Sequence, residues 1–212
     1  MHLLVTERLA CPHCGPDFGL VLVADRLENR RVLEGFFGCA NCQARYPVRE
    51  GFGDLRPAPG GGGRGVAAEG GTPESASDPE AALALAALLG LTVGSGFILL
   101  TGRSVGNAEA LSGMGDGFEI LAAHPRLEDS AGFEGVSRMA IGARFPFRTR
   151  SLRGVVLEGR AGMEVLDEGG RVLAPGSRLV LLDPPSEGRG AMEGAGLQVL
   201  AGDKSALVGA LK

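Results

Sequence analysis

Apolar and polar positions divide the second half of the chain into short helices and strands. After Asp78, a residue typical of a helix N-cap, and Pro79, a stretch rich in alanine and leucine predicts a helix that ends near Leu89. We expect strands at residues 97–101, 118–122, 138–143, 154–158, 178–183 and 197–201, and helices at 108–114 and 161–166. Short apolar strands that alternate with helices are typical of a parallel sheet covered on both faces, so this part predicts an α/β fold.

The first part of the chain has a different pattern and a different composition. Residues 20–27 and 31–37 predict a hairpin with its turn at Glu28-Asn29, and all four cysteines precede residue 43. Residues 58–77, "APGGGGRGVAAEGGTPESAS", hold almost no large apolar side chain, which is typical of a flexible linker. The sequence therefore predicts an N-terminal domain at 1–57, a glycine-rich linker at 58–77 and an α/β domain at 78–212.

One uncharged segment raises the alternative of a membrane span. Residues Ala81 to Thr101 carry no charge over 21 residues, which is long enough to cross a bilayer. However, Gly90, Gly94 and Gly96 interrupt the segment, and no aromatic belt flanks it. We interpret it as a buried helix, a turn and a buried strand.

Charge and location give weaker indications. The formal net charge is −4, and the arginines are scattered along the sequence without a basic stripe, so nucleic-acid binding is not indicated. Residues Met1 to Ala10 lack the long apolar core of a signal peptide. We therefore expect a cytoplasmic, reducing compartment, in which paired cysteines more often bind metal than form disulfides.

Two Cys-x-x-Cys pairs, Cys11/Cys14 and Cys39/Cys42, flank the predicted hairpin and are separated by 24 residues. Each pair can form a tight turn that directs both sulfur atoms to one point. Four thiolates suit tetrahedral Zn²⁺, with bonds of about 2.3 Å, and leave no open position for a catalytic water. So small a region builds little core, and we expect structural zinc to be coupled to its folding. The alternatives are reduced cysteines that pack as small apolar residues, or a redox pair; His13 is expected to face solvent.

The residues around these pairs resemble a known family. "LLVTERLACPHCG" and the later "GCANCQARYPVREGFGDLRP" are similar to the small zinc-ribbon proteins that activate tRNA and protein methyltransferases. The shared features are a leucine-rich helix before the first pair, a Tyr-Pro-Val strand at 46–48, an acidic-Gly turn at 50–51 and Leu-Arg-Pro at 55–57. The same ribbon is found at the N-terminus of some bacterial methyltransferases, directly before a catalytic domain.

The second part resembles a class I methyltransferase, which binds S-adenosylmethionine. The stretch "FILLTGRSVGNAEALSG" has the layout of a strand, a glycine loop and a helix, and Gly102 and Gly106 match two loop glycines, with Ser104 replacing the middle one. "ARFPFRTRSLRGVVLEG" and "RVLAPGSRLVLLDP" are similar to two further runs of that family. The resemblance implies Gly102, Ser104 and Gly106 as cofactor-binding residues, although a plain strand-to-helix turn would need the same glycines.

The carboxylates that this family uses to hold the cofactor are missing. No acid precedes the glycine loop, and residues 122–124, where a ribose-binding acid is expected, are Ala-Ala-His. The position for an adenine contact, 141–143, is Ile-Gly-Ala. A nucleophile elbow is another interpretation, because the loop fits G-x-S-x-G around Ser104. That motif requires a later acid followed by a histidine, and His124 comes too early for it.

These features predict a zinc-binding, methyltransferase-like protein without catalytic residues, which acts as a protein-binding or accessory subunit of a larger complex. The ribbon could anchor such a complex by strand addition. The alternative is an active S-adenosylmethionine-dependent methyltransferase whose ribbon recognises an RNA or protein substrate. The sequence alone leaves the partner open.

Overall fold

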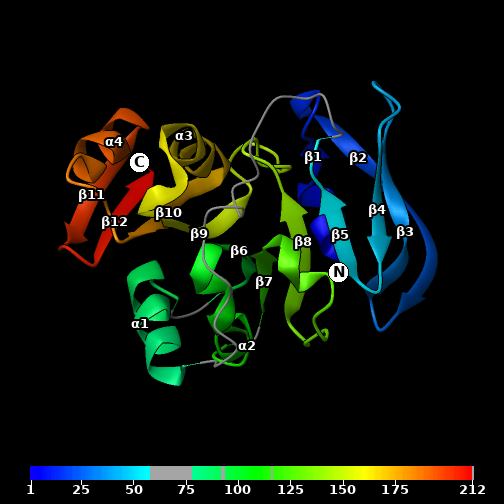
Figure 1. The fold of residues 1–212 in the computed structure, drawn as a ribbon, viewed down its shortest axis with the longest axis horizontal. Coiled ribbons are helices and arrows are strands. Elements are labelled where there is room, and N and C mark those ends of the chain that lie inside the picture. Colours follow the sequence, from blue (N-terminus) through cyan, green and yellow to red (C-terminus); the bar gives the residue numbers. More distant parts are fainter. Residues whose placement is uncertain (58–77, 92–93, 116, 212) are drawn as a thin grey trace.

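The computed structural model describes residues 1–57, 78–91, 94–115 and 117–211. These residues form one 12-stranded sheet in the order β1-β2-β3-β4-β5-β8-β7-β6-β9-β10-β12-β11 (Figure 1). Its strands are β1 Ala10–Cys11, β2 Gly15–Glu28, β3 Arg31–Cys39, β4 Arg45–Arg49, β5 Phe52–Leu55, β6 Gly96–Thr101, β7 Phe118–Ala123, β8 Val136–Ile141, β9 Leu152–Glu158, β10 Leu173–Leu182, β11 Leu197–Gly202 and β12 Ala206–Leu211. The α-helices are α1 Pro79–Leu89, α2 Ala108–Ser112, α3 Met163–Val172 and α4 Gly188–Gly194, and the 3-10 helices are η1 Leu3–Arg8, η2 Gly102–Asn107, η3 Pro125–Leu127 and η4 Gly159–Ala161.

The C-terminal region, which begins at Asp78, is a doubly wound α/β fold, as the sequence predicts. Strands β8, β7, β6, β9 and β10 are parallel, and β12 enters antiparallel between β10 and β11. The chain starts at β6, builds outward to β7 and β8, and then returns to β9 on the other side. The direction of building reverses between β6 and β9, and such a switch point is where open α/β sheets bind ligands.

Side chains that alternate along the central strands supply two hydrophobic cores. Leu99, Leu121 and Val155 belong to one core together with side chains of α3 and α4. Ile98 and Ile120 belong to the other, together with side chains of α1 and α2. Because both faces of the strands are covered, the strands read as continuous apolar runs.

Helix α1 and strand β6 lie where the uncharged segment predicts a helix and a strand, but the helix is buried on one face only. The carboxylate of Asp78 accepts a hydrogen bond from the amide of Glu80 at 3.0 Å, Pro79 occupies the first turn, and Gly90 ends the helix with φ 69°. The strand β6 follows, and residues 92–93 of the expected turn lie outside the described residues. No helix in the described ranges is long and apolar enough to cross a membrane.

The glycine-rich helices and the last strand differ from the predictions. Helix α3 was expected to end near residue 166 but continues to Val172, and α4 and β12 were not expected. Gly169 lies inside α3, where a Cβ atom would stand 2.7 Å from Leu179 and 2.9 Å from Leu157. The glycine that argues against a helix in the sequence therefore permits this helix to lie close to the sheet.

The N-terminal region, residues 1–57, contains the expected hairpin. Strands β2 and β3 are antiparallel, and Glu28 opposite Arg31 is their last pair before the turn. The turn is therefore at Asn29-Arg30, one residue later than predicted. Both turn residues have positive φ, 46° and 63°, which the right-handed twist of a two-residue hairpin requires.

The two regions share one sheet through β5 and β8. These strands are parallel, with Phe52 opposite Arg138 and Leu55 opposite Ile141 (Figure 1). Side chains of both regions also meet in one hydrophobic cluster. Its members include, from the N-terminal region, Val5, Leu9, Phe37, Tyr46 and Leu55, and from the C-terminal region Leu121, Met139, Ile141, Phe145 and Phe147. The predicted linker at 58–77 lies outside the described residues.

A half-buried ion pair also joins the two regions. Arg31 on β3 donates to both carboxylate oxygens of Glu119 on β7, each at 3.0 Å, and to the carbonyl of Val136 at 2.9 Å. Ser137 donates to Glu119 at 2.6 Å and accepts from the amide of His2 at 2.8 Å. The network spans strands from both regions, so its geometry depends on their packing.

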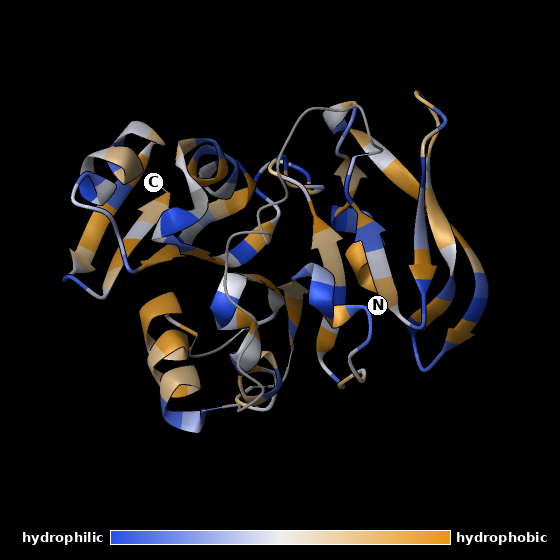
Figure 2. Cartoon of the chain, in the orientation of Figure 1, coloured by the Kyte–Doolittle hydropathy of each residue, from blue (hydrophilic) through white to orange (hydrophobic). Residues whose placement is uncertain are grey.

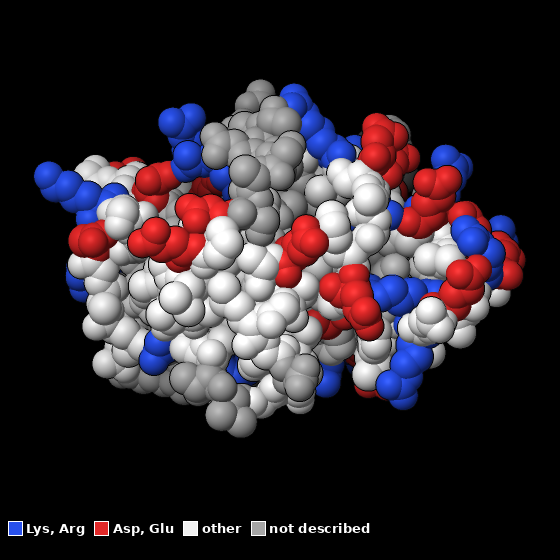
Figure 3. All heavy atoms as spheres, turned by 90° about the horizontal axis from the view of Figure 1, so that it is seen from below, with Lys and Arg blue, Asp and Glu red and all other residues white. Residues whose placement is uncertain are grey.

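Apolar residues are not confined to the interior. Beyond its first turn, helix α1 is hydrophobic around its circumference (Figure 2), and Leu83 on it is 63% exposed. From below, the surface over α1 and α2 is largely uncharged, with charged groups mostly toward the rim (Figure 3). Such a surface differs from the mixed charged surface that is common on small domains.

Candidate functional site

The structure brings the four predicted metal ligands together. Cys11, Cys14, Cys39 and Cys42, here called the sulfur quartet, are all free, and their sulfur atoms lie within 4.8 Å of one another. Sulfur atoms from opposite pairs are close, at 3.7 Å for Cys11 and Cys42 and 3.8 Å for Cys14 and Cys39. Zn–S bonds of about 2.3 Å in a tetrahedron imply sulfur separations of about 3.8 Å.

Local backbone geometry favours a thiolate at Cys39. Burial alone would raise the pKa of Cys39, but amide groups of Cys42 and Asn41 directed at its sulfur lower that pKa to about 7. The Ala44 amide favours the thiolate of Cys42, yet burial and the three neighbouring sulfur atoms raise its pKa to about 12. Cys39 therefore loses its proton readily, whereas Cys42 loses its proton with difficulty because a second thiolate would be repelled by the first. A divalent cation would offset this repulsion between thiolates.

Residues around the quartet hold its sulfur atoms in place. The amide of Cys14 donates to the Cys11 sulfur at 3.4 Å, and Asn41 donates to the Cys14 sulfur at 3.3 Å. The buried hydroxyl of Tyr46 lies 3.4 Å from the Cys11 sulfur. His13 is exposed, as expected, and its Nδ1 is 3.9 Å from the Cys14 sulfur.

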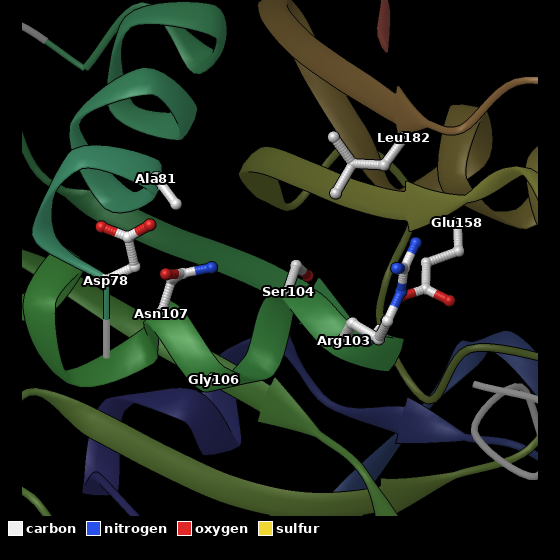
Figure 4. Close-up of a pocket in the computed structure, with 8 residues that line it drawn as sticks. All are labelled: Asp78, Ala81, Arg103, Ser104, Gly106, Asn107, Glu158 and Leu182. Atoms are coloured by element: carbon white, nitrogen blue, oxygen red, sulfur yellow. Dashed lines mark hydrogen bonds and ion pairs between the residues drawn. The ribbon is translucent and has the colours of Figure 1, made fainter. Parts of the chain in front are cut away.

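A second candidate site lies at the switch point of the sheet. A cavity of about 210 Å³ opens beyond the carboxyl ends of β6, β9 and β10 (Figure 4). It is lined by Asp78, Ala81, Arg103, Ser104, Gly106, Asn107, Glu158 and Leu182. Two of the three predicted cofactor residues, Ser104 and Gly106, thus line it, and Gly102 lies directly before them on η2. Pockets for drug-sized ligands are typically larger, about 300–1,000 Å³.

The protein's own side chains fill part of this crevice. Gly102 has φ 59°, and a Cβ atom there would stand 2.5 Å from the carboxyl carbon of Glu158. The Glu158 carboxylate accepts a short hydrogen bond from the amide of Arg103. The Arg103 guanidinium lies 3.4 Å from Glu158 and forms a close ion pair with Asp183 (Figure 4 shows its contact with Glu158).

We refer to Glu158, Arg103 and Asp183 as the crevice bridge. It connects the ends of β9 and β10 to the glycine loop after β6. The charge of Glu158, followed by the hydrogen bond to Asp183 and the charge of Asp183, raises the pKa of Arg103 above its usual value. The sequence analysis did not identify Glu158 as a site residue. Its place at the end of an apolar strand beside the switch point was the signal that could have identified it.

The end of β7, where the resemblance places a ribose-binding acid, is apolar and buried. Ala122 and Ala123 are 1% exposed, and His124 is 2% exposed. His124 caps η3, and its Nδ1 accepts a hydrogen bond from the amide of Arg126 at 3.1 Å. These residues place no carboxylate at this strand end.

Ser104 does not have the environment of a nucleophile. Its hydroxyl donates to the carbonyl of Thr101 at 2.7 Å, and its side chain is buried within η2. His124 is engaged in capping η3. A nucleophile elbow presents its serine at an exposed turn beside a histidine base, so this arrangement does not support the hydrolase interpretation.

No protein-family model matches the sequence, and no match was found among curated proteins. Among solved structures, a complex between the Haloferax volcanii Trm112 methyltransferase activator and a methyltransferase is similar at 16% identity, with 62% of this chain and 87% of that chain covered and a TM-score of 0.49. A TehB-like SAM-dependent methyltransferase from Corynebacterium glutamicum is 18% identical, with 62% and 86% covered and a TM-score of 0.47. The cyclase SpnF is 12% identical, with 58% of each chain covered and a TM-score of 0.45. Similarity at this level concerns fold alone, and one fold hosts many activities.

Proposed function

We propose that this protein is a zinc-binding, methyltransferase-like accessory subunit whose cofactor crevice has lost its function. The observation that carries the proposal is the crevice bridge, because the Glu158 carboxylate and the Arg103 side chain lie directly against the glycine loop. A cofactor would have to approach the backbone of the glycine loop closely. The Glu158 carboxylate already lies against this backbone, at Gly102 and the amide of Arg103. The strand end with Ala122 and Ala123 supplies no replacement carboxylate.

The N-terminal region would be a zinc ribbon that stabilises the C-terminal region from within the same chain. The spacing of the sulfur quartet fits one tetrahedral Zn²⁺, which would stabilise the ribbon in addition to the apolar cluster that it shares with the C-terminal region. Strand β5 extends the sheet at β8, and the pair of Arg31 with Glu119 fixes the register of this contact. The chain would thereby carry its own stabilising strand, and we infer that it acts in the cytoplasm with a protein partner.

Calorimetric titration with S-adenosylmethionine and with S-adenosylhomocysteine tests this function. We expect no binding at micromolar concentrations, since each lost charge-assisted hydrogen bond costs about 1.5–3 kcal/mol of affinity. Metal analysis of the same sample should give one zinc per chain. Micromolar binding of either nucleoside would overturn the accessory role, and a folded protein without bound metal would overturn the ribbon.

An active methyltransferase is the second candidate, and one observation favours it. The cavity lies at the switch point of the sheet, where an α/β protein of this topology binds its ligand, and Glu158 is directed into it. The bridge would then have to open before a cofactor entered. Transfer of a labelled methyl group to protein or RNA in an extract would support this candidate, and an unlabelled extract would count against it.

A further inference from the structure

The segment that runs from β8 into β9 concentrates positive charge. Residues 135–157 contain five arginines and no acidic residue, although the whole chain has a net charge of −4. One of the five, Arg138, is buried, and its guanidinium donates to the carbonyl of Leu127 at 2.9 Å. The other four, at positions 144, 148, 150 and 153, are exposed or half-buried.

The fold brings two of these arginines beside a third from the N-terminal region. The amide of Arg148 donates to the carbonyl of Arg8 at 2.8 Å. The Arg8 guanidinium carbon lies 5.9 Å from the centre of the Phe97 ring. Arg153 is adjacent to the same place, because a Cβ atom on Gly96 would stand 2.9 Å from the Arg153 Cβ. We call Arg8, Arg148 and Arg153 the arginine edge.

The arginine edge lies at the end of the sheet opposite the crevice. Ile98 on β6 is opposite Gly154 on β9, so Phe97 and Arg153 stand side by side near the amino ends of their strands. The Arg148 guanidinium reaches the N-terminal region, where it occupies the space beside Gly19. Both regions therefore contribute to this surface.

The arginine edge retains its capacity to bind an anion. Within the described residues, the ion pairs involve other arginines and none of these three. Glu119 is on the strand next to Phe97, but it is already bound by Arg31 and Ser137. Arginine forms bidentate hydrogen bonds with carboxylates, which distinguishes it from a lysine patch.

An aromatic side chain accompanies these charges, since Phe97 is half-buried under Arg8. Exposed carboxylates at Glu7 and Asp17 interrupt the positive surface. A nucleic-acid backbone carries charge at every step and would meet these carboxylates, whereas a peptide can place its acids opposite the arginines alone.

We propose that the arginine edge binds an acidic, aromatic-containing peptide segment of a protein partner. This inference rests on the proposed accessory function and names the surface that the partner contacts. Carboxylates of the segment pair with Arg8, Arg148 and Arg153, and an aromatic side chain packs beside Phe97. Because the pairs are solvent-exposed, binding weakens as ionic strength rises.

Fluorescence anisotropy of the full-length protein tests the proposal. The probes are a short labelled peptide of glutamate and phenylalanine, the same peptide with lysine in place of glutamate, and a labelled single-stranded RNA. We expect binding of the acidic peptide alone. Combined replacement of Arg8, Arg148 and Arg153 by alanine should weaken that binding about tenfold or more.

A matched control removes the same charge elsewhere. The variant with Arg26, Arg160 and Arg189 replaced by alanine should bind the acidic peptide as the wild type does. Since Arg148 packs against Gly19, Arg148→Gln and a circular-dichroism spectrum distinguish lost binding from lost folding. Equal weakening in the control, no binding of the acidic peptide, or preferential binding of the RNA would overturn the proposal. The nucleoside titration reports separately on the accessory function.

Discussion

The sulfur quartet and the crevice are two sites of one chain with opposite organisation. In the quartet, four sulfur atoms face one another within 4.8 Å, and the amides of Cys42 and Asn41 favour the thiolate of Cys39. In the crevice, the charged groups face one another as cation and anions, and Arg103 satisfies both Glu158 and Asp183. The quartet is a set of like groups that needs a cation, whereas the crevice already holds a cation between its two carboxylates.

This difference shows how a candidate site can be judged without a bound ligand. A set of like charges or lone pairs held close together costs free energy until a ligand joins it. Opposite charges that already pair with each other gain much less free energy from a ligand. Their ion pairs must also be broken before a ligand can bind between them. The chain therefore has stronger physical reason to hold a metal at residues 11–42 than to hold a nucleoside at the glycine loop.

Loss of the metal should have the largest effect. Replacement of Cys39 by alanine removes one of four ligands, and structural zinc contributes about 10–16 kcal/mol to the folding of small zinc domains. We expect loss of bound zinc and a fall of about 10 °C or more in the midpoint of thermal unfolding. Metal analysis and circular dichroism measure both. His13→Ala is the control and should retain zinc; loss of zinc there would make His13 a ligand.

The ion pair between the regions should have the next largest effect. Glu119→Ala leaves Arg31, whose side chain is 19% exposed, without its carboxylate, and breaking such a pair costs about 3 kcal/mol. Urea denaturation should show this loss in a single transition, because β5 and β8 share one sheet. The double variant Arg31→Met/Glu119→Leu should recover most of the stability. A transition confined to one region would contradict the shared core.

Gly102→Ala should have an intermediate effect. The substitution places a Cβ atom against Glu158 and forces alanine to φ 59°, which together cost about 1–3 kcal/mol of unfolding free energy. Gly113→Ala is the control, because Gly113 has an ordinary φ of −80° and its nearest non-neighbouring atoms stand 3.7 Å away. Equal stability of the two variants in urea would mean that Glu158 does not occupy the loop.

The smallest effect is expected at the crevice bridge itself. The side chains of Arg103 and Asp183 are 57% and 60% exposed, so Arg103→Ala should lower the unfolding free energy by less than about 1 kcal/mol. The double variant Arg103→Ala/Glu158→Ala sharpens the comparison, since it opens the crevice. S-adenosylhomocysteine should still not bind, because the strand end at Ala122 and Ala123 lacks a carboxylate. Micromolar binding would show that the bridge alone excludes it.

Local patterns were sufficient for much of the fold. The cap at Asp78, the apolar run of β6 and the Cys-x-x-Cys spacing each act within a few residues, so their signals are present in the sequence. Helix α3 is longer than predicted. Its glycines are accommodated because Gly169 packs against Leu157 and Leu179, which belong to other elements of the fold. The crevice bridge was not predicted for the same reason, since Arg103, Glu158 and Asp183 are far apart in sequence.

The sequence by itself determined the α/β class, the helix α1, the hairpin to within one residue and the four thiols at metal-ligand spacing. These follow from periodicity, capping and short-range spacing, which depend on neighbours along the chain. Only the tertiary structure decided that β5 joins β8, that Glu158 lies over Gly102 and that distant arginines meet at one end of the sheet. Those contacts depend on which strands become neighbours, and long-range packing selects that order after local structure has formed.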